Sequence, residues 1–390
     1  MNPSAHGWIK KLLQEVAKND SFLNYEEDAF YSDLRACGFI YGSNLSVVAQ
    51  ILKKSDLTEE ELCKTNLCLA FLYVHANSNA KHSFVDSIIN FYTNISALKI
   101  SFFQELLGEI KSSEQLEKII HKRIQIDDNI ITKNFNYFII NALLFVDVLA
   151  YREYLKNESI SNDYIKDLEA AIESISLDVL KSKTSTNKYD ESLIKLFESS
   201  LRHQSNAHIS YKNAINILKT PQEKQYIIDL GCMATWSDRT IDKDEQKFLI
   251  KLGNDLNVNP SIVNQSITSV NQFYTSNKDN IALLSSKNIV KSFYNNSTRM
   301  VTKLISRNSK RLYQELKDSK ELMILISQST VRDLNKEEQK KVQEQLLDIF
   351  KSIPSLAIFL LPGGALLLPL VVKFIPKLLP SAFDDNRIEE

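Results

Sequence analysis

The sequence predicts an all-α, multi-helical protein, and three observations support this fold class. Glycine and proline are scarce, with eight of each among 390 residues. Five of the prolines lie in the last tenth of the chain, so the first 350 residues hold only three. A β-rich chain spends both residue types on frequent turns, whereas the apolar residues here recur at helical spacing. We therefore expect long helices joined by short polar connections.

Composition and pattern divide the chain into five predicted segments. In the first, stripes such as NFNYFIINALLFVDVLAYREYL alternate with joints rich in Ser, Asn and Lys. Within it, the glycine-containing stretch Ala36–Asn44 predicts a tight connection between helices. The segments are an N-terminal helical domain (1–205), a compact helical module (206–286), basic amphipathic helices (287–351), a hydrophobic segment (352–383) and an acidic tail (384–390).

Charge and motif content argue against several classes of function. The chain has 47 basic and 48 acidic side chains, so its net charge of −1 gives no global attraction for nucleic acid. We find no nucleotide-binding loop, nucleophile elbow or metalloprotease motif, and we expect neither an enzyme nor a cofactor. The four cysteines lack disulfide or metal spacing, which predicts buried free thiols in a reducing compartment. No signal peptide is visible, so the bulk of the chain is expected to be cytoplasmic.

The predicted module at 206–286 is marked by three helix starts. Thr220-Pro221-Gln222-Glu223 has a hydroxyl at the cap, proline at the first helical position and glutamate three residues after the cap. Asp242 and Glu245 repeat this spacing before a second helix, and Asn259-Pro260 begins a third. Three short capped helices in about fifty residues indicate a compact unit.

The same stretch, MATWSDRTIDKDEQKFLIKLGNDLNV, resembles the tellurite-resistance TerB-like domain. Asp238, Ile241 and Glu245 match the family pattern, whereas Arg239 stands where glycine is usual. The carboxylates of Asp238, Asp242 and Glu245 are weak candidates for a Ca²⁺ or Mg²⁺ site. Capping and favourable contact with the helix dipole explain the same acids without a metal, and that is the reading we favour.

A basic amphipathic helix is predicted between Lys287 and Lys320. Apolar residues such as Val301 and Leu304 keep a helical period there, while the basic residues outnumber the acidic ones. Two interpretations stay open, a solvated outer face or a patch that attracts anionic lipid head groups. The lipid-facing candidates are Lys303, Arg307, Lys310 and Arg311.

The hydrophobic segment has no charged residue between Lys351 and Lys373. Twenty helical residues span roughly 30 Å, the thickness of a bilayer core, but prolines and a Gly-Gly pair interrupt this run. We expect contact with membrane lipid, either as a kinked span or as a re-entrant hairpin, over a buried hairpin in a soluble core. Backbone carbonyls freed at membrane depth need partners, which favours a homo-oligomer. The residues that define the segment are Pro354, Pro362, Gly363, Gly364, Pro369, Lys373, Pro376 and Pro380.

Residues 334–383 resemble the membrane segment of the leucine-zipper, EF-hand-containing transmembrane (LETM) family. That family shows a polar helix, a proline at the membrane entrance, an apolar run, and then Leu-Leu-Pro, Lys-x-x-Pro and Leu-Pro-Ser-x-Phe. Together with the TerB-like middle, the chain is most similar to bacterial LETM-related proteins associated with biofilms. The matching residues are Pro354, Pro362, Leu367, Leu368, Pro369, Lys373, Pro376, Leu379, Pro380, Ser381 and Phe383.

The resemblance implies cation/proton exchange in ion homeostasis and ribosome binding through a domain after the membrane segment. The chain departs from both, since Gly363-Gly364-Ala365 stands where family members often carry a glutamate and seven residues follow Phe383. We therefore expect a membrane-associated scaffold with an unknown protein partner. The alternatives are a subunit of a cation/proton exchange system, a ribosome-binding protein, and a soluble TerB-like stress protein.

Overall fold

A computed structural model describes most of the chain. The described residues are 1–52, 56–96, 112–124, 141, 143–181, 209–235, 241, 243–277, 289–329, 332, 334–353, 355–356, 359, 367–368, 370–372 and 375. Every regular element in these ranges is a helix, so the predicted all-α class is confirmed.

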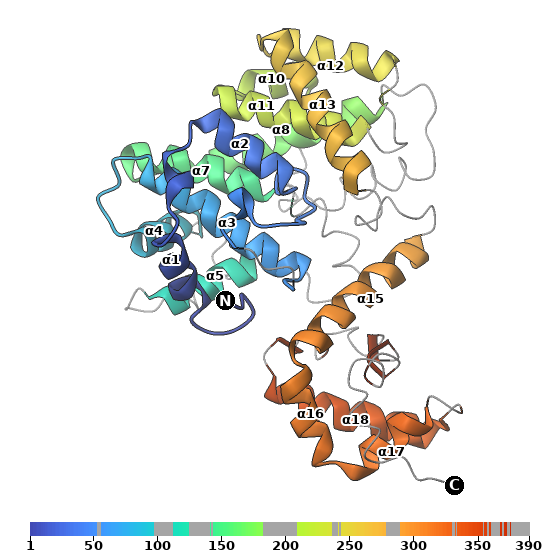
Figure 1. The fold of residues 1–390 in the computed structure, drawn as a ribbon. Coiled ribbons are helices and arrows are strands. Elements are labelled where there is room, and N and C mark those ends of the chain that lie inside the picture. Colours follow the sequence, from blue (N-terminus) through green and yellow to red (C-terminus); the bar gives the residue numbers. More distant parts are fainter. Residues whose placement is uncertain are drawn as a thin grey trace.

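Helices from residues 8 to 277 form one body, which we call the helical body (Figure 1). Short 3₁₀ turns at Ser21–Asn24 and Val48–Gln50 flank α2 and precede α3. The helices are α1 (Trp8–Val16), α2 (Glu27–Ala36), α3 (Glu59–Ala76), α4 (Phe84–Ser96), α5 (Ser113–Ile124), α7 (Leu144–Asn157), α8 (Asn162–Lys181), α10 (Tyr211–Ile217), α11 (Pro221–Thr235), α12 (Lys243–Asp255) and α13 (Pro260–Asn277).

A second body, the C-terminal module, hangs below the first in Figure 1. Its helices are α15 (Ile289–Arg307), α16 (Ser309–Lys317), α17 (Lys320–Gln328) and α18 (Lys336–Ser352). The long α15 leads from the helical body into the module, and the described part of residues 353–375 packs on the module.

The two bodies have separate hydrophobic cores. One core runs from Trp8 to Tyr274 and contains residues of both the predicted N-terminal domain and the predicted module at 206–286. α3 lies at its centre, with nearly all of its length buried. The other core runs from Val301 to Ile375 and belongs to the C-terminal module.

Local sequence signals explain several boundaries in the helical body. Thr220 and Glu223 form the predicted capping box, in which Oγ1 of Thr220 accepts from the amide of Glu223 at 3.2 Å and the glutamate accepts from the amide of Thr220 at 2.8 Å. The three predicted helices of this region are confirmed as α11, α12 and α13. After α2 the chain turns at Gly38, whose φ of +85° is one that side chains with a Cβ rarely adopt.

Polar groups and thiols are also buried in the helical body. Arg35 of α2 and Asp229 of α11 form an ion pair with both side chains at most 3% exposed. The Asp229 carboxylate accepts from Nε of Arg35 at 2.9 Å and from the Tyr31 hydroxyl at 2.7 Å, while Nη2 of Arg35 donates to Ser266 of α13 at 2.8 Å. All four cysteines are free and buried, and burial raises the pKa of Cys37 to about 12.

Candidate functional site: the C-terminal module and its junction

The C-terminal module covers the described part of the hydrophobic segment with its own helices. Leu367 and Val371 are fully buried, and the ring of Phe359 lies 4.8 Å from that of Phe350 in α18. A protein interior and a lipid interior both remove apolar surface from water, so this run satisfies the same chemistry inside the module. The buried members of the run are Ile353, Leu356, Phe359, Leu367, Leu368, Leu370, Val371 and Ile375.

The residues that defined the predicted membrane segment lie outside the described part of the chain. This holds for Pro354, Pro362, Gly363, Gly364, Pro369, Lys373, Pro376 and Pro380. Among the residues that are described, no helix has both the length and the apolar character needed to cross a membrane. The membrane segment therefore stays a prediction.

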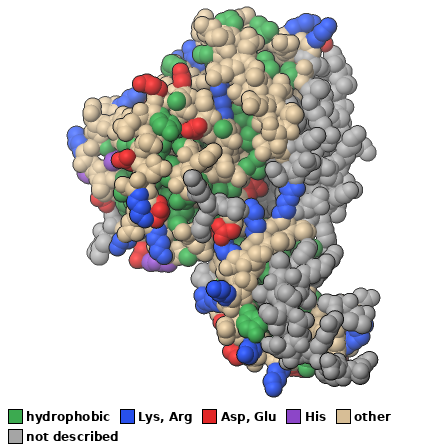
Figure 2. All heavy atoms as spheres, in the orientation of Figure 1, with side chains coloured by type: hydrophobic (Ala, Val, Ile, Leu, Met, Phe, Trp, Pro, Cys, Tyr) green, Lys and Arg blue, Asp and Glu red, His purple; other side chains and the backbone are tan. Residues whose placement is uncertain are grey.

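The four predicted lipid-facing cations fall into two pairs. Lys310 and Arg311 are exposed, and Arg311 donates to the carbonyl oxygen of Ser352. Lys303 and Arg307 instead face the helical body, where Nζ of Lys303 donates to the carbonyl oxygen of Leu57 at 3.0 Å. Acidic and basic side chains lie close together where the two bodies meet (Figure 2).

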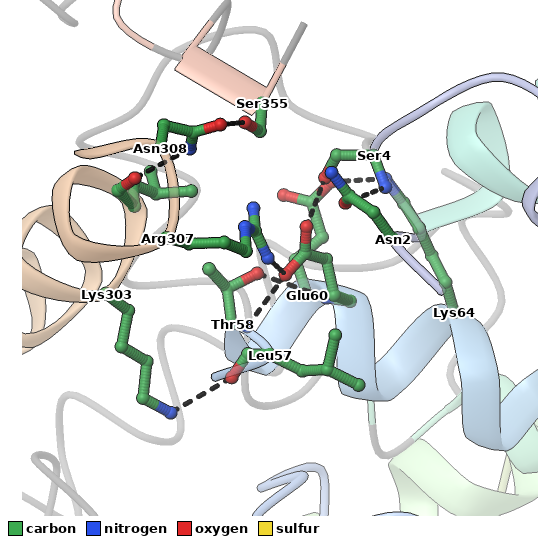
Figure 3. A network of polar contacts seen from close by, with 12 residues as sticks. Asn2, Ser4, Leu57, Thr58, Glu60, Lys64, Lys303, Arg307, Asn308 and Ser355 are labelled. Atoms are coloured by element: carbon green, nitrogen blue, oxygen red, sulfur yellow. Dashed lines mark hydrogen bonds and ion pairs between the residues drawn. The ribbon is translucent and has the colours of Figure 1, made fainter. Parts of the chain in front are cut away.

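Glu61, in the first turn of α3, accepts hydrogen bonds from several sides of this junction. Three of the residues that donate to it, Ser4, Thr58 and Arg307, are labelled in Figure 3. Glu61 completes a capping box with Thr58, since its Oε2 accepts from the amide of Thr58 at 2.9 Å. The same oxygen accepts from Nη1 of Arg307 at 2.5 Å, and Oε1 accepts from the Ser4 hydroxyl at 2.6 Å. The Arg307 and Glu61 side chains are 9% and 1% exposed. One carboxylate thus joins the N-terminal segment, α3 and α15.

Glu59 adds a second carboxylate to the same turn. Burial raises the pKa of Glu59 to about 7, although the nearby cations of Lys303 and Arg299 act in the opposite direction. Glu60 points elsewhere and pairs with Lys64 at 2.7 Å. The turn therefore presents Glu59 and Glu61 to α15.

Replacing Glu59 with glutamine is expected to change how stability depends on pH. The pKa of the Glu59 carboxyl is about 7 in the folded state and 4.5 ordinarily, so its protonation stabilises the fold fully below pH 4.5. This contribution is lost as the pH rises from 4.5 through about 7. The Glu59→Gln variant lacks it, so its free energy of unfolding relative to wild type should rise by about 2 kcal/mol from acid to neutral pH. Urea unfolding at both ends of this window measures the difference. Glu344→Gln, at an exposed position of α18, should show no such trend.

The other side of α15 holds the start of the hydrophobic segment. Asn308 follows Arg307 directly, and its Oδ1 accepts from the Ser355 hydroxyl at 3.0 Å (Figure 3). The Ser352 hydroxyl donates to Glu315 of α16 at 3.1 Å. Within two residues, the end of α15 therefore contacts both the cap of α3 and the entrance of the hydrophobic segment.

A family model described as LETM1-like, RBD matches residues 334–390. The C-terminal region is LETM1-like. No curated protein and no solved structure matches the chain. The predicted resemblance to the LETM family is confirmed at this level, while the likeness to biofilm-associated relatives and to TerB stays a prediction.

The LETM1-like region begins one residue before the cap of α18. Asn335 caps this helix through another reciprocal capping box, with Glu338 at 2.9 Å in both directions. Arg332 binds both oxygens of Glu338, which lowers the pKa of this carboxyl to about 2. The matched region contains α18, the hydrophobic segment and the seven residues after Phe383.

The weak metal candidates are not brought together by the described structure. Asp238 and Asp242 lie outside the described residues, and Glu245 is fully buried in the first turn of α12. In the ranges that the structure describes, no group of three or more His, Cys, Asp or Glu side chains is arranged to hold a metal ion.

Sequence reasoning did not single out Glu59, Glu61, Ser4 or Asn308. The pattern Thr58-x-x-Glu61 before an apolar run is a readable capping-box signal, the same one that marked Thr220 and Glu223. That signal predicts the start of α3. Its second role, as the partner of Arg307 at a separation of 246 residues, has no local signature.

Proposed function

We propose that this protein is a membrane-associated helical scaffold, whose LETM1-like region contacts lipid while the helical body binds a protein partner. The observation that carries the proposal is the LETM1-like match at 334–390, which includes a run without charge from Ser352 to Val372. The exposed cations Lys310 and Arg311 stand beside the entrance of this run and would favour anionic lipid.

Lipid contact requires the hydrophobic segment to leave the core of the C-terminal module. Leu367, Leu368, Leu370 and Val371 are at most 4% exposed there, so they do not meet lipid in this arrangement. The exchange is inexpensive in one respect, because these side chains would pass from one apolar environment to another. Helices α15 to α18 would then expose the apolar faces that the segment had covered, and these faces also favour the membrane.

Deleting residues 352–383 is expected to move the protein from the membrane fraction to the soluble fraction. The segment contains the uncharged apolar run from Ser352 to Val372, so full-length protein should sediment with membranes and withstand a high-salt wash. Fractionation of cells that express either form measures this. Wild-type protein that is already fully soluble would refute the proposal.

A second candidate is ribosome binding, which the family resemblance implies. It is favoured by the description of the matched model, LETM1-like, RBD. Co-sedimentation with ribosomes through a sucrose cushion tests it, and deletion of residues 334–390 should abolish the association. Cation/proton exchange has less support, because an intramembrane carboxylate is the usual proton carrier and the run from Ser352 to Val372 has none.

A soluble TerB-like stress protein is the third candidate. It rests on the sequence pattern around Asp238, Ile241 and Glu245 alone. A shift in melting temperature on dialysis against a chelator would support it. The biofilm-associated role implied by the resemblance has no further support from the described residues.

A further inference from the structure

Two cations on the basic face of α15, Lys303 and Arg307, contact the start of α3 in the same molecule. Arg307 pairs with Glu61. The charges of Lys303 and Arg299 act to lower the pKa of Glu59, against the larger effect of its burial. Lys303 also binds the carbonyl oxygen of Leu57, directly before the cap of α3. The start of α3 therefore contacts Lys303 and Arg307, two of the four cations that the sequence offers as candidates for binding anionic head groups (Figure 3).

The covered state leaves Arg307 incompletely satisfied. Only Nη1 donates to Glu61, while Nε and Nη2 are buried without a hydrogen-bond partner in the described structure. These two nitrogens form the edge of a guanidinium group that binds phosphate or carboxylate in bidentate fashion. A buried donor without a partner is costly, so Arg307 can gain hydrogen bonds by exchanging Glu61 for another oxyanion.

The contact between α3 and α15 lies beside the hydrophobic segment. Asn308 and Arg311, within one turn of Arg307, bind Ser355 and the carbonyl oxygen of Ser352 at the entrance of that segment. An anionic surface that the segment approaches would therefore face Lys303 and Arg307 of α15, which we call the basic stripe. Separate hydrophobic cores let the two bodies part without opening either core.

We propose that the first turn of α3 is an intramolecular cover for the basic face of α15, and that an anionic lipid surface displaces it. This inference rests on the proposed function, since it states how membrane association is regulated. Glu59 and Glu61 act as an internal substitute for lipid phosphate. Displacement adds Lys303 and Arg307 to the exposed pair, Lys310 and Arg311.

The test uses the full chain and neutralises the cover. The variant Glu59→Gln/Glu61→Gln keeps the size of both side chains, and glutamine at position 61 can still complete the capping box. The single variant Glu59→Gln leaves the ion pair of Arg307 in place, so it remains informative if the double variant unfolds. A matched control, Glu337→Gln/Glu344→Gln, removes the same charge from exposed positions of α18. Adding Lys303→Gln/Arg307→Gln to the double variant removes the stripe itself.

The first measurement is acylation of lysines by an amine-reactive reagent, without vesicles. Lys310 is exposed and serves as the internal standard, whereas Lys303 is half-buried. We expect Lys303 to react several-fold more slowly than Lys310 in wild type and to approach it in the double variant. Equal rates in wild type, or no change in the variant, would overturn the cover.

The second measurement is flotation with vesicles of phosphatidylglycerol and phosphatidylcholine, against phosphatidylcholine alone. Binding of the double variant to the anionic vesicles should rise by about fivefold or more per released cation, the factor that one lysine or arginine contributes near anionic lipid. The gain should be absent with neutral vesicles, and it should be lost when the stripe is removed. A gain no larger than that of the α18 control would overturn displacement by lipid.

The two hypotheses fail in different ways. Vesicle binding that is lost on deletion of residues 352–383 but unchanged by the glutamine substitutions overturns the inference alone. Absence of binding by every form overturns the proposed function and displacement by lipid together, while faster acylation of Lys303 would still establish the cover.

Discussion

The variant Asp229→Asn is expected to be less stable than wild type by about 3–5 kcal/mol, because it leaves the charge of Arg35 buried without a counter-ion. Asp229 is fully buried in α11 and accepts hydrogen bonds from Arg35 and Tyr31 of α2. Asparagine keeps the size of the side chain but not its charge. Urea unfolding followed by circular dichroism measures the loss.

Two further variants make this expectation specific. Arg35→Met in the Asp229→Asn background removes the unpaired charge, so stability should recover in part. Asp255→Asn serves as the control, because Asp255 accepts from Tyr211 at 2.8 Å but lies at an exposed position of α12. Its effect should stay within about 1 kcal/mol. An Asp229→Asn variant as stable as this control would refute the assigned role of the pair.

Glu61→Gln is expected to cost about 2–4 kcal/mol, somewhat less than Asp229→Asn because Arg307 is 9% exposed. Glutamine at position 61 can still accept from the amide of Thr58, and its NH₂ group can donate to the hydroxyl oxygen of Ser4, so the loss mainly reports the missing charge opposite Arg307. A double-mutant cycle with Arg307→Met isolates this term by urea unfolding. The pair should show a coupling of about 1–3 kcal/mol, and additive single effects would argue against a direct interaction.

The exposed ion pair of Lys340 and Glu344 in α18 provides the comparison for that cycle. Its side chains are 77% and 65% exposed, and its nitrogen and oxygen are 3.9 Å apart. Solvent screens such a pair, so its coupling should not exceed about 0.5 kcal/mol. The contrast between the two pairs tests whether burial determines the strength of the junction.

Local signals predicted the helices well. Scarcity of glycine and proline predicted the fold class, and the Thr220-Pro221 signal located the start of α11 at Pro221. Helix starts and ends depend on interactions within one turn of the backbone, so neighbouring residues in the sequence are enough to predict them. Gly38 and Gly42, which marked an irregular connection, indeed have positive φ.

The candidate site could be predicted only in part, because its contacts join distant residues. A helical period showed that α15 has an apolar and a basic face, but it did not show that Glu61 of α3 would cover Arg307. Likewise, the uncharged run from Ser352 to Val372 indicated a non-aqueous environment. Composition does not distinguish lipid from the interior of α15 to α18, because both accept the same side chains.

The cysteines are confined to one of the two bodies, so the two bodies differ in their reactivity toward thiol reagents. Every sulfhydryl of the chain lies in the helical body, shielded from water, and the C-terminal module has none of its own. A maleimide reagent would therefore react with the native cysteines only after the helical body unfolds. A single cysteine engineered at an exposed position of α18 would react before them. Fluorescent or spin probes attached there could follow the C-terminal module alone, without replacement of the four native cysteines.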